Sequence, residues 1–581
     1  MKHIILYITL ISFILVFNRC SEEDFNSKYE DPSKVTIISV PNLMTGVMQR
    51  EKEYSLMQYY RYFSFDTQFV GKFAQTFGFS ASTGMYEPGY AQFVEGQWAR
   101  FYRTMSNYIM LVAEYEKLAE AEKPSYEIFM LAAKTHLYDW LLACVDLFGD
   151  MPFSEACTLP LTSDVVASMP KYDTAADIYS TVLDELKACA ERFHNPNLIK
   201  IAKFNTQDFV NWGDVDKWAR YANSIRLRGA LRISQHGPLV EKGRAAIKEI
   251  LENPTQYPLV DSNDKNIFIV NQDAGELNFD GGGGLGDWTS CRMASGAIVD
   301  RMLSNGNYDK AKPSSGTFVA GVDDPRLPLL FTMRTGTRTE GAQEYTLVDT
   351  ATVKPLYFVG VDVSRTALDP EYYDDSGNSE VVQNGFFWQN RRWDHFLMTA
   401  SEMLFAKAEA YYRGWGVAKD DAKAEEAFKA AISQSIKMYY KYNENSTGAK
   451  TTALATPNDA TINAFANARW ASSLNPAIPY ASADPKLDAI LTQKWLHWGI
   501  FFSREAWSQI RRTGYPKLVY PNSGGIIDWV PDRWRYPIEE RNYNPNYPGF
   551  SNDTYYGILF WADPKGMRHS TNTGGNWTDQ Y

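Results

Sequence analysis

The sequence predicts a mainly α-helical protein built from helix pairs, with one irregular, loop-rich region. Two observations predict this fold class. Amphipathic stretches with apolar residues at helical spacing recur before residue 253 and again after residue 393. Between them, residues 254–392 are rich in Gly, Pro, Asp and Asn and hold only short β-like runs, such as 266–270 and 355–363.

Five helices are expected in the first part, and residues typical of helix ends mark their bounds. Pro41 stands near the start of the first, and Gly149 follows the third as a stop signal. Ser125, Asp173 and Asp214 occupy N-cap positions at the start of the last three. The expected helices span residues 41–63, 96–123, 125–149, 173–193 and 214–234.

Helices return after the loop-rich region, at 395–415, 420–442 and 484–512. In the first of these, Glu409 and Arg413 lie four residues apart and predict an ion pair on the exposed face. Residues 513–581 are rich in proline and aromatic residues and predict irregular structure. Successive helix pairs suggest tetratricopeptide-like units, although no strict repeat of about 34 residues is visible.

The N-terminus indicates export. Ile4–Phe17 is apolar, Cys20 follows, and Ser21–Asp24 is polar and acidic. This order resembles a bacterial lipoprotein signal in which Cys20 becomes the acylated N-terminus. Arg19 and Phe17 depart from the small and aliphatic residues usual before such a cysteine, so a plain cleaved signal stays open. No apolar run of 18 residues is expected after Cys20, so the sequence predicts no membrane-spanning helix.

Composition excludes several classes of protein. A net charge of −11 and a pI near 5.3 argue against nucleic-acid binding and against docking on anionic lipid. No CxxC or HExxH motif occurs and the seven histidines are scattered, so neither a metal enzyme nor a cofactor is expected. Apart from Cys20, four cysteines are buried thiols or disulfide partners, and spacing leaves this open: Cys144, Cys157, Cys189 and Cys291.

Several blocks along the chain resemble the SusD/RagB family, and the last ones are closest to its SusD-like branch. A helix running into Asp-x-Phe-Gly-Asp-x-Pro, an Asp-Asp-Pro-Arg block, an Ala-Glu-Ala helix, a Glu-Ala-Trp…Arg-Arg-Thr-Gly-Tyr-Pro block and an Arg-x-x-Tyr-Pro-x-x-Glu block follow in the family's order. They stand at Val145–Ala156, Asp323–Pro328, Leu397–Trp415, Ile490–Leu518 and Asp532–Asn544.

The resemblance implies a SusD-like fold, mainly α, in which tetratricopeptide-like units support an irregular ligand-binding half. It implies a nutrient-binding, non-enzymatic lipoprotein on the outer-membrane surface of a Gram-negative, Bacteroidetes-type bacterium. Such proteins capture oligosaccharides and pass them to a SusC-like TonB-dependent transporter. The expected organisation is a signal peptide at 1–19, an acidic tether at 20–40 and one domain at 41–581. Within it, the helical scaffold covers about 41–253 and 393–512, and the loop-rich binding region covers about 254–392. Residues 513–581 form an irregular C-terminal segment.

Most signature residues are expected to serve the scaffold. Asp146, Gly149 and Asp150 predict a helix stop and a tight turn into Pro152. Arginines on the expected helices, where they satisfy neighbouring carbonyls, predict the same structural role, because a signature shared across a family needs no shared substrate. These scaffold residues are Trp218, Asn223, Arg226, Arg228, Trp507, Arg511 and Arg512.

The sugar-binding residues are expected where the helical pattern fails, in loops 77–90 and 275–292. Trp288, in a glycine-rich polar loop, is the first candidate for stacking on a sugar ring, and Tyr86 is the second. Asn278 and Asp280 are candidate partners of sugar hydroxyls. For Trp288 the alternative is a ring that fills the core. An acidic run at 369–378 predicts a solvated turn, with a calcium ion left open.

Two other functions remain open at this point. One is a surface glycan-degrading enzyme with two catalytic carboxylates, although no local motif selects a pair. The other is a tetratricopeptide-type scaffold that binds only proteins.

Overall fold

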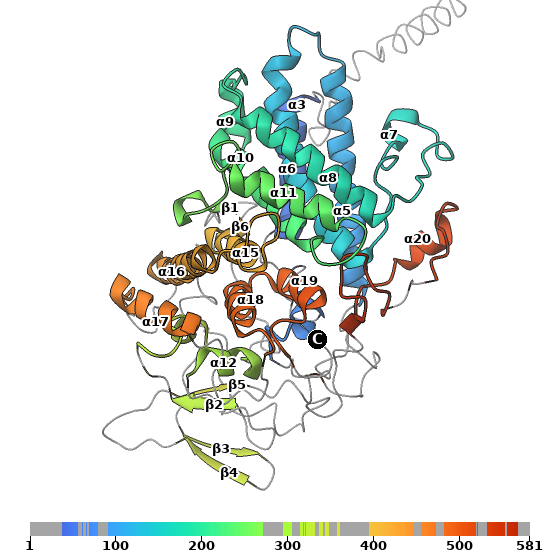
Figure 1. Ribbon diagram of the computed structural model, residues 1–581. Helices are drawn as coiled ribbons and strands as arrows, with labels where there is room; N and C mark the ends of the chain where they lie inside the picture. The colour runs from blue at the N-terminus through green and yellow to red at the C-terminus, as the bar shows by residue number, and fades with distance from the viewer. Residues whose placement is uncertain are drawn as a thin grey trace, which may run out of the picture.

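The computed structural model describes most of residues 38–567 (Figure 1). Residues 1–37 and 568–581 lie outside the described part, as do internal stretches and single positions. These are 56–60, 62–64, 67–68, 79–90, 271–293, 305–313, 318, 320, 332–335, 341–342, 348–356, 361–393, 446–454, 472–481, 519, 521–530, 552 and 554.

Helices dominate the described residues, as the sequence predicts. Those before the loop-rich region are α3 (Val40–Ser55), α4 (Gly71–Phe73), α5 (Ala91–Glu116), α6 (Lys123–Phe148), α7 (Leu159–Thr162), α8 (Ala175–His194), α9 (Ala202–Gln207), α10 (Val215–Arg232) and α11 (Val240–Glu252), with the short 3-10 helix η2 (Asn263–Lys265). Within and after it come α12 (Gly296–Met302), α13 (Leu327–Leu330), α15 (Ala400–Arg413), α16 (Asp421–Asn445), α17 (Asp459–Ala471), α18 (Pro485–Trp498), α19 (Ser503–Thr513) and α20 (Ile538–Tyr543).

Neighbouring helices pack in pairs, and the pairs stack into one helical layer (Figure 1). The main pairs are α15 with α16, α8 with α10, and α3 with α5, followed by α5 with α6 and α10 with α11. α15 also packs on α18, and α10 on α15, which joins the two helical parts of the chain. Large rings such as Trp140, Trp218 and Trp507 are almost fully buried between the helices. This arrangement confirms the predicted fold class of tetratricopeptide-like helix pairs.

Strands are short and occur as antiparallel pairs in the described residues. β1 (Ile267–Ile269) pairs with β6 (His395–Met398), β2 (Ser314–Thr317) with β5 (Tyr357–Gly360), and β3 (Gly336–Glu340) with β4 (Gln343–Leu347). β1 and β5 confirm the two predicted β-like runs. The pairs β2–β5 and β3–β4 lie beyond the helices, at the lower end in Figure 1.

Helix starts follow local capping chemistry, with two corrections. Asp214 caps α10 as predicted, because its Oδ1 accepts a hydrogen bond from the Lys217 N–H at 3.1 Å. α6 begins at Lys123, so Ser125 lies inside the helix rather than at its cap. Thr174, not Asp173, caps α8 by accepting from the Asp177 N–H at 3.1 Å.

Three expected helices differ from the structure. Residues 395–398 form β6 rather than a helix. α15 begins at Ala400, and the Thr399 side chain caps it by accepting a hydrogen bond from the Glu402 N–H. The span 484–512 is two helices, because Gly499 takes a φ of 45° that few other residues adopt. The helix expected over 96–123 runs instead from 91 to 116. α11, α17 and α20 are additional helices that the sequence pattern did not predict.

The face assigned to the Glu409–Arg413 pair is also corrected. The Glu409 carboxylate lies 3.3 Å from Arg413 Nε but is fully buried, where it also accepts two hydrogen bonds from Arg512. The sequence pattern placed Glu409 on the exposed side, because a carboxylate is normally buried only when a partner balances its charge. That partner, Arg512, lies on a distant helix that the local pattern does not include.

α6 also differs from the expectation that no long apolar stretch follows Cys20. By length and composition, α6 is long and apolar enough to cross a membrane. Of its 18-residue apolar stretch, 83% is buried inside the protein. Its apolar side chains therefore belong to the core of the helical layer.

Cys144, Cys157 and Cys189 are free thiols, and Cys291 lies outside the described residues.

Candidate functional site

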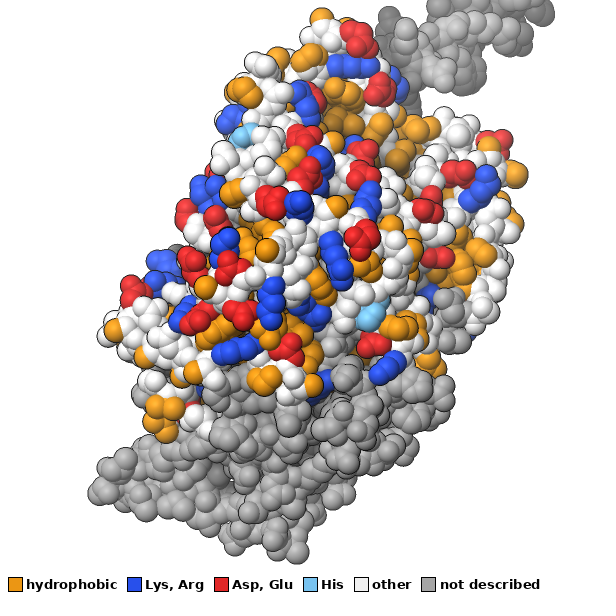
Figure 2. All heavy atoms as spheres, viewed as in Figure 1, with side chains coloured by type: hydrophobic (Ala, Val, Ile, Leu, Met, Phe, Trp, Pro, Cys, Tyr) orange, Lys and Arg blue, Asp and Glu red, His pale blue; other side chains and the backbone are white. Residues whose placement is uncertain are grey.

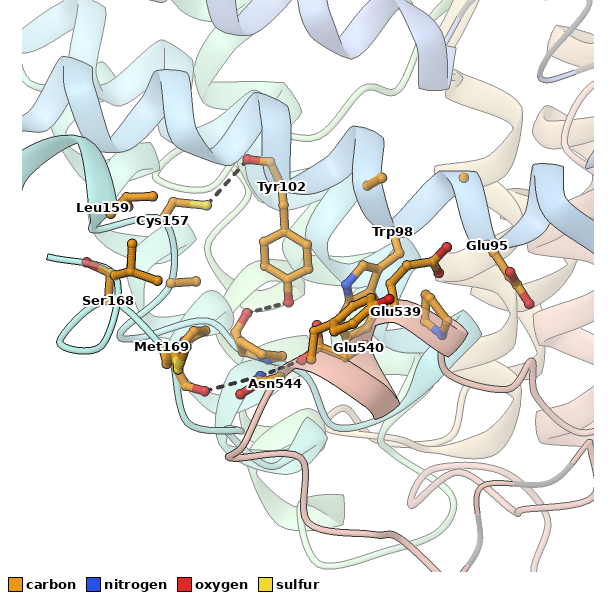
Figure 3. Close-up of a pocket in the computed structure, with 18 residues that line it drawn as sticks. Glu95, Trp98, Tyr102, Cys157, Leu159, Ser168, Met169, Glu539, Glu540 and Asn544 are labelled. Carbon is orange, nitrogen blue, oxygen red and sulfur yellow. Dashed lines mark hydrogen bonds between the residues drawn. The ribbon is translucent and has the colours of Figure 1, made fainter. Parts of the chain in front are cut away.

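A groove of about 740 Å³ lies between α5, the chain around α7 and the C-terminal α20 (Figure 3). This size falls within the roughly 300–1,000 Å³ typical of ligand sites. Three chain segments far apart in sequence build it: 95–102, 152–170 and 537–544. Most of its lining is apolar. Leu159, Val165 and Met169 contribute from the segment around α7, and Pro537 and Tyr543 from the C-terminal segment.

Aromatic rings form the inner wall, and Trp98 is packed against other rings. Trp98 is only 6% exposed and makes edge contacts with Phe148 at 5.1 Å and Tyr536 at 5.8 Å between ring centroids. The Tyr102 hydroxyl donates to the Pro152 carbonyl at 2.7 Å. These contacts fix the wall rigidly and leave little ring surface for a ligand to stack on.

Glu95 and Glu539 lie at one end of the groove, away from Leu159, and Glu540 lies beside Asn544 (Figure 3). Glu540 accepts from the Tyr172 hydroxyl at 2.9 Å and from the Asn544 side-chain amide at 2.5 Å. Glu539 and Glu95 complete the acidic end. Burial, and next the negative charge of Glu539, raise the pKa of Glu95, while Arg541 and Arg535 oppose the shift.

The segment before α8 is held by hydrogen bonds from its acidic residues. Asp173 Oδ2 accepts from the Phe153 and Ser154 N–H groups, both at 2.9 Å. Asp150 Oδ1 accepts from the Ala175 N–H at 2.7 Å, after Gly149 has ended α6 with a φ of 85°. The helix stop and turn expected at these residues are therefore present, and the turn positions one wall of the groove.

The arginines of α10 bind carboxylates more than carbonyls. Arg228 donates to Asp139 at 2.8 Å and to Glu402 at 2.6 Å, and Arg232 lies 3.0 Å from Asp146. The space beside this cluster is about 10 Å³, which is room for one water at most. It therefore acts as a structural network that joins α6, α10 and α15, and no ligand fits there.

Arg511 fits the original expectation better, since it donates to the carbonyls of Asp146 and Asp532 at 2.7 and 2.8 Å. Trp218 donates to Asp208 at 2.7 Å, and Asn223 donates to the Pro258 carbonyl at 3.1 Å. Arg226 pairs with Glu249. These contacts assign structural roles to the signature residues of α10 and α19.

Within the described residues, no group of three or more His, Cys, Asp or Glu side chains is arranged to hold a metal ion. His395 and His497 are buried, and burial lowers the pKa of both, in His395 to about 3. Burial raises the pKa of Cys157 to about 12, so this groove thiol stays protonated.

The predicted ligand and lipidation residues lie outside the described residues. These are Trp288, Tyr86, Asn278, Asp280 and Cys20, and the acidic run 369–378 also lies there. Sequence reasoning missed the groove, because one wall follows the turn predicted at Pro152 and another comes from a C-terminal segment predicted to be irregular. The available signal was the apolar run "TLPLTSDVVASMP" at 158–170, which has no helical or strand period.

The chain is similar to known proteins in sequence and in fold. A SusD-like family model, described as "starch-binding associating with outer membrane", matches residues 32–537. Comparison with curated protein sequences finds no match.

Solved structures share the fold at low identity. A chitin-binding protein is 23% identical with a TM-score of 0.65, and the alignment covers 89% of this chain and 99% of that one. A SusD homologue from Parabacteroides distasonis is 19% identical (TM-score 0.62; 93% and 100% covered). A chitin-binding SusD homologue from Flavobacterium johnsoniae is 18% identical (TM-score 0.59; 90% and 98% covered).

Proposed function

The chain belongs to the SusD-like family of starch-binding proteins that associate with the outer membrane, and from this premise we propose that it is a cell-surface lipoprotein that captures oligosaccharides. It delivers them to a SusC-like TonB-dependent transporter in the same membrane and performs no catalysis. The observation that carries this proposal is the family match over residues 32–537, which spans both helical parts and the loop-rich region between them.

The N-terminus supports the anchoring part of the proposal. An apolar run that ends before Cys20, followed by acidic residues, suits cleavage and acylation at Cys20. A Cys20→Ser variant is expected to move from the membrane fraction to the periplasm or medium, because it lacks the acyl chains. Immunoblots of fractionated cells measure this, and Cys144→Ser is the control. A C20S protein that stays with the outer membrane would contradict acylation.

The main sugar-binding residues are assigned to loops. Trp288 offers a ring for stacking on the C–H face of a sugar, Tyr86 a second ring, and Asn278 and Asp280 bind hydroxyls. Two structural neighbours are described as chitin-binding, so chitin-derived oligosaccharides are the first ligands to test.

Replacing Trp288 with alanine is expected to weaken oligosaccharide binding at least tenfold, about 1.4 kcal/mol, because a stacking ring is lost. Isothermal titration calorimetry, with ligands chosen from a glycan array, measures this. Trp212→Ala is the matched control, since Trp212 is 54% exposed and does not belong to the loops proposed to bind sugar. Equal affinities of both variants and the wild type would exclude Trp288 from the site.

Incubation of the protein with labelled oligosaccharides separates the other candidate functions. Chromatography is expected to recover the labelled oligosaccharide intact after binding. Steady release of shorter products would instead indicate a glycan-degrading enzyme. A protein that binds none of the arrayed glycans would fit a scaffold for protein partners only.

A further inference from the structure

The groove between α5, α7 and α20 contains an open aromatic ring. Tyr543 lines it from the C-terminal segment and is 76% exposed. Trp98 lines it from α5 but is only 6% exposed, so stacking on a ligand falls to Tyr543. An exposed ring in a groove offers a flat face to the C–H side of a sugar ring.

Charged side chains of both signs stand at one end of the groove. Glu95 and Glu539 line it there (Figure 3). Arg541 and Arg535 lie near enough to oppose the rise in the Glu95 pKa that burial and the charge of Glu539 cause. Carboxylates accept hydrogen bonds and guanidinium groups donate them, whereas a hydroxyl group does both. This end therefore offers partners for the hydroxyl groups of a neutral ligand, and the arginines weaken its attraction for a cation.

The segment around α7 gives the groove an aliphatic wall. Leu159, Val165, Met169 and Pro170 line it, and Leu159 and Val165 are 46% and 61% exposed. Figure 2 shows apolar side chains where α7 and α20 lie in Figure 1. Such a wall gains free energy by covering an apolar group and forms no hydrogen bond to a hydroxyl. It therefore suits a sugar that carries an N-acetyl group, because the acetyl methyl is apolar.

Hydrogen bonds fix this wall in place. Asp164 Oδ1 accepts from the Val166 N–H at 2.9 Å and from the Ala167 N–H at 3.1 Å. The Asn546 side-chain amide donates to the Met169 carbonyl at 2.8 Å, which ties the α7 segment to the chain after α20. Because the wall is already ordered, a ligand that binds there loses little free energy to ordering it.

We propose that this groove is a second carbohydrate site, which takes a neutral oligosaccharide with N-acetyl groups. Tyr543 stacks on one sugar ring, Glu539 and Arg541 bind hydroxyl groups, and the aliphatic wall of the α7 segment covers an acetyl methyl. The sugar as ligand rests on the proposed function. The site itself uses none of the residues proposed in loops 77–90 and 275–292, so the two assignments can fail separately.

Hydroxyl-radical footprinting of the full-length protein tests the site. Radicals oxidise exposed aromatic rings, and mass spectrometry measures the oxidation at each one. A saturating tetramer of N-acetylglucosamine is expected to lower the oxidation of Tyr543 at least threefold. Trp212 is the control, since it is 54% exposed outside the groove and its oxidation should not change. The same protection of Tyr543 is expected in the Trp288→Ala variant, because the groove does not use Trp288.

The stacking ring is tested by variants of Tyr543. Met169 also lines the groove, and its thioether is a second oxidation probe. Tyr543→Ala is expected to remove the protection of Met169 by the N-acetylglucosamine tetramer. Tyr543→Phe is expected to keep it, because the ring remains. Since this side chain is largely exposed, both variants should fold as the wild type does.

The preference for N-acetyl groups is tested with a glucose tetramer of the same linkage. Half-maximal protection of Tyr543 is expected to need at least fivefold more of this tetramer. The double variant Leu159→Ser with Val165→Ser is expected to remove most of that difference, because the wall no longer favours a methyl group. Its protection by the glucose tetramer should match that of the wild type, which shows that the variant is folded.

Each other outcome overturns a specific claim. Oligosaccharide binding in calorimetry without protection of Tyr543 would exclude the groove as a sugar site and keep the proposed function. Protection that is lost in W288A would indicate one joint site instead of a second one. Equal half-maximal concentrations of the two tetramers would reject the preference for N-acetyl groups. A wild-type protein that binds no oligosaccharide would reject the proposed function, and with it a sugar as the ligand of the groove.

Discussion

Replacing Arg228 with methionine is expected to lower the free energy of unfolding by about 3–5 kcal/mol, because it leaves buried carboxylates without a positive partner. Arg228 ion-pairs with Asp139 on α6 and Glu402 on α15, whose side chains are 4% and 1% exposed. It also donates to the Leu397 carbonyl at 3.1 Å. The substitution therefore weakens the contacts of α10 with α6, α15 and β6 at once, although methionine fills a similar volume.

Chemical denaturation followed by circular dichroism measures this loss. The control is Lys171→Met, because Lys171 pairs with Glu155 across 3.3 Å at a solvent-exposed position where both side chains are more than half exposed. An exposed pair contributes about 0–1 kcal/mol, so the control should unfold nearly as the wild type does. An R228M protein within 1 kcal/mol of the wild type would show that this network does not hold the helices together.

Replacing Glu409 with glutamine is expected to cost about 3 kcal/mol at pH 7 and much less at pH 3. Burial alone would raise the pKa of Glu409, but the charge and hydrogen bonds of Arg512, with Arg413, lower it to about 2. The ordinary value of 4.5 applies in the unfolded chain. A depressed carboxyl pKa stabilises the folded state above pH 4.5, and this contribution is lost as the pH falls toward 2.

The size of this effect follows from the shift, since each pKa unit corresponds to about 1.4 kcal/mol. Unfolding curves of E409Q and the wild type at pH 7, 5, 4 and 3 should therefore converge as the pH falls. Glu425→Gln is the control, because Glu425 pairs with Lys429 at a partly exposed position and should change stability by less than about 1 kcal/mol at any of these pH values. A pH-independent difference between E409Q and the wild type would contradict the depressed pKa.

The buried ion pairs also support the groove, because they fix the helical layer that carries the groove walls. Ion pairs that join α6, α10, α15 and α19 fix the helical layer, and segments that leave this layer form the groove walls. Tyr102 on α5 and Tyr172 before α8 connect the two by hydrogen bonds to Pro152 and Glu540. A rigid layer therefore presents the apolar segments of α7 and α20 in one fixed arrangement.

The sequence alone was sufficient for features that depend on near neighbours. Helical periodicity located most of the long helices, and Asp214 and Gly149 marked helix ends, because capping acts within a few residues of the chain. The ordered motifs from Val145 to Asn544 also indicated the family before any contact was known.

Only the tertiary structure decided burial and the groove, because both depend on residues far apart in the chain. Glu409 is buried since Arg512, 103 positions later, balances its charge. Glu540 reaches the groove since Tyr172, 368 positions earlier, binds it. Periodicity describes one helix at a time, and the free energy of burying a charge is set by partners that only the packed chain brings together.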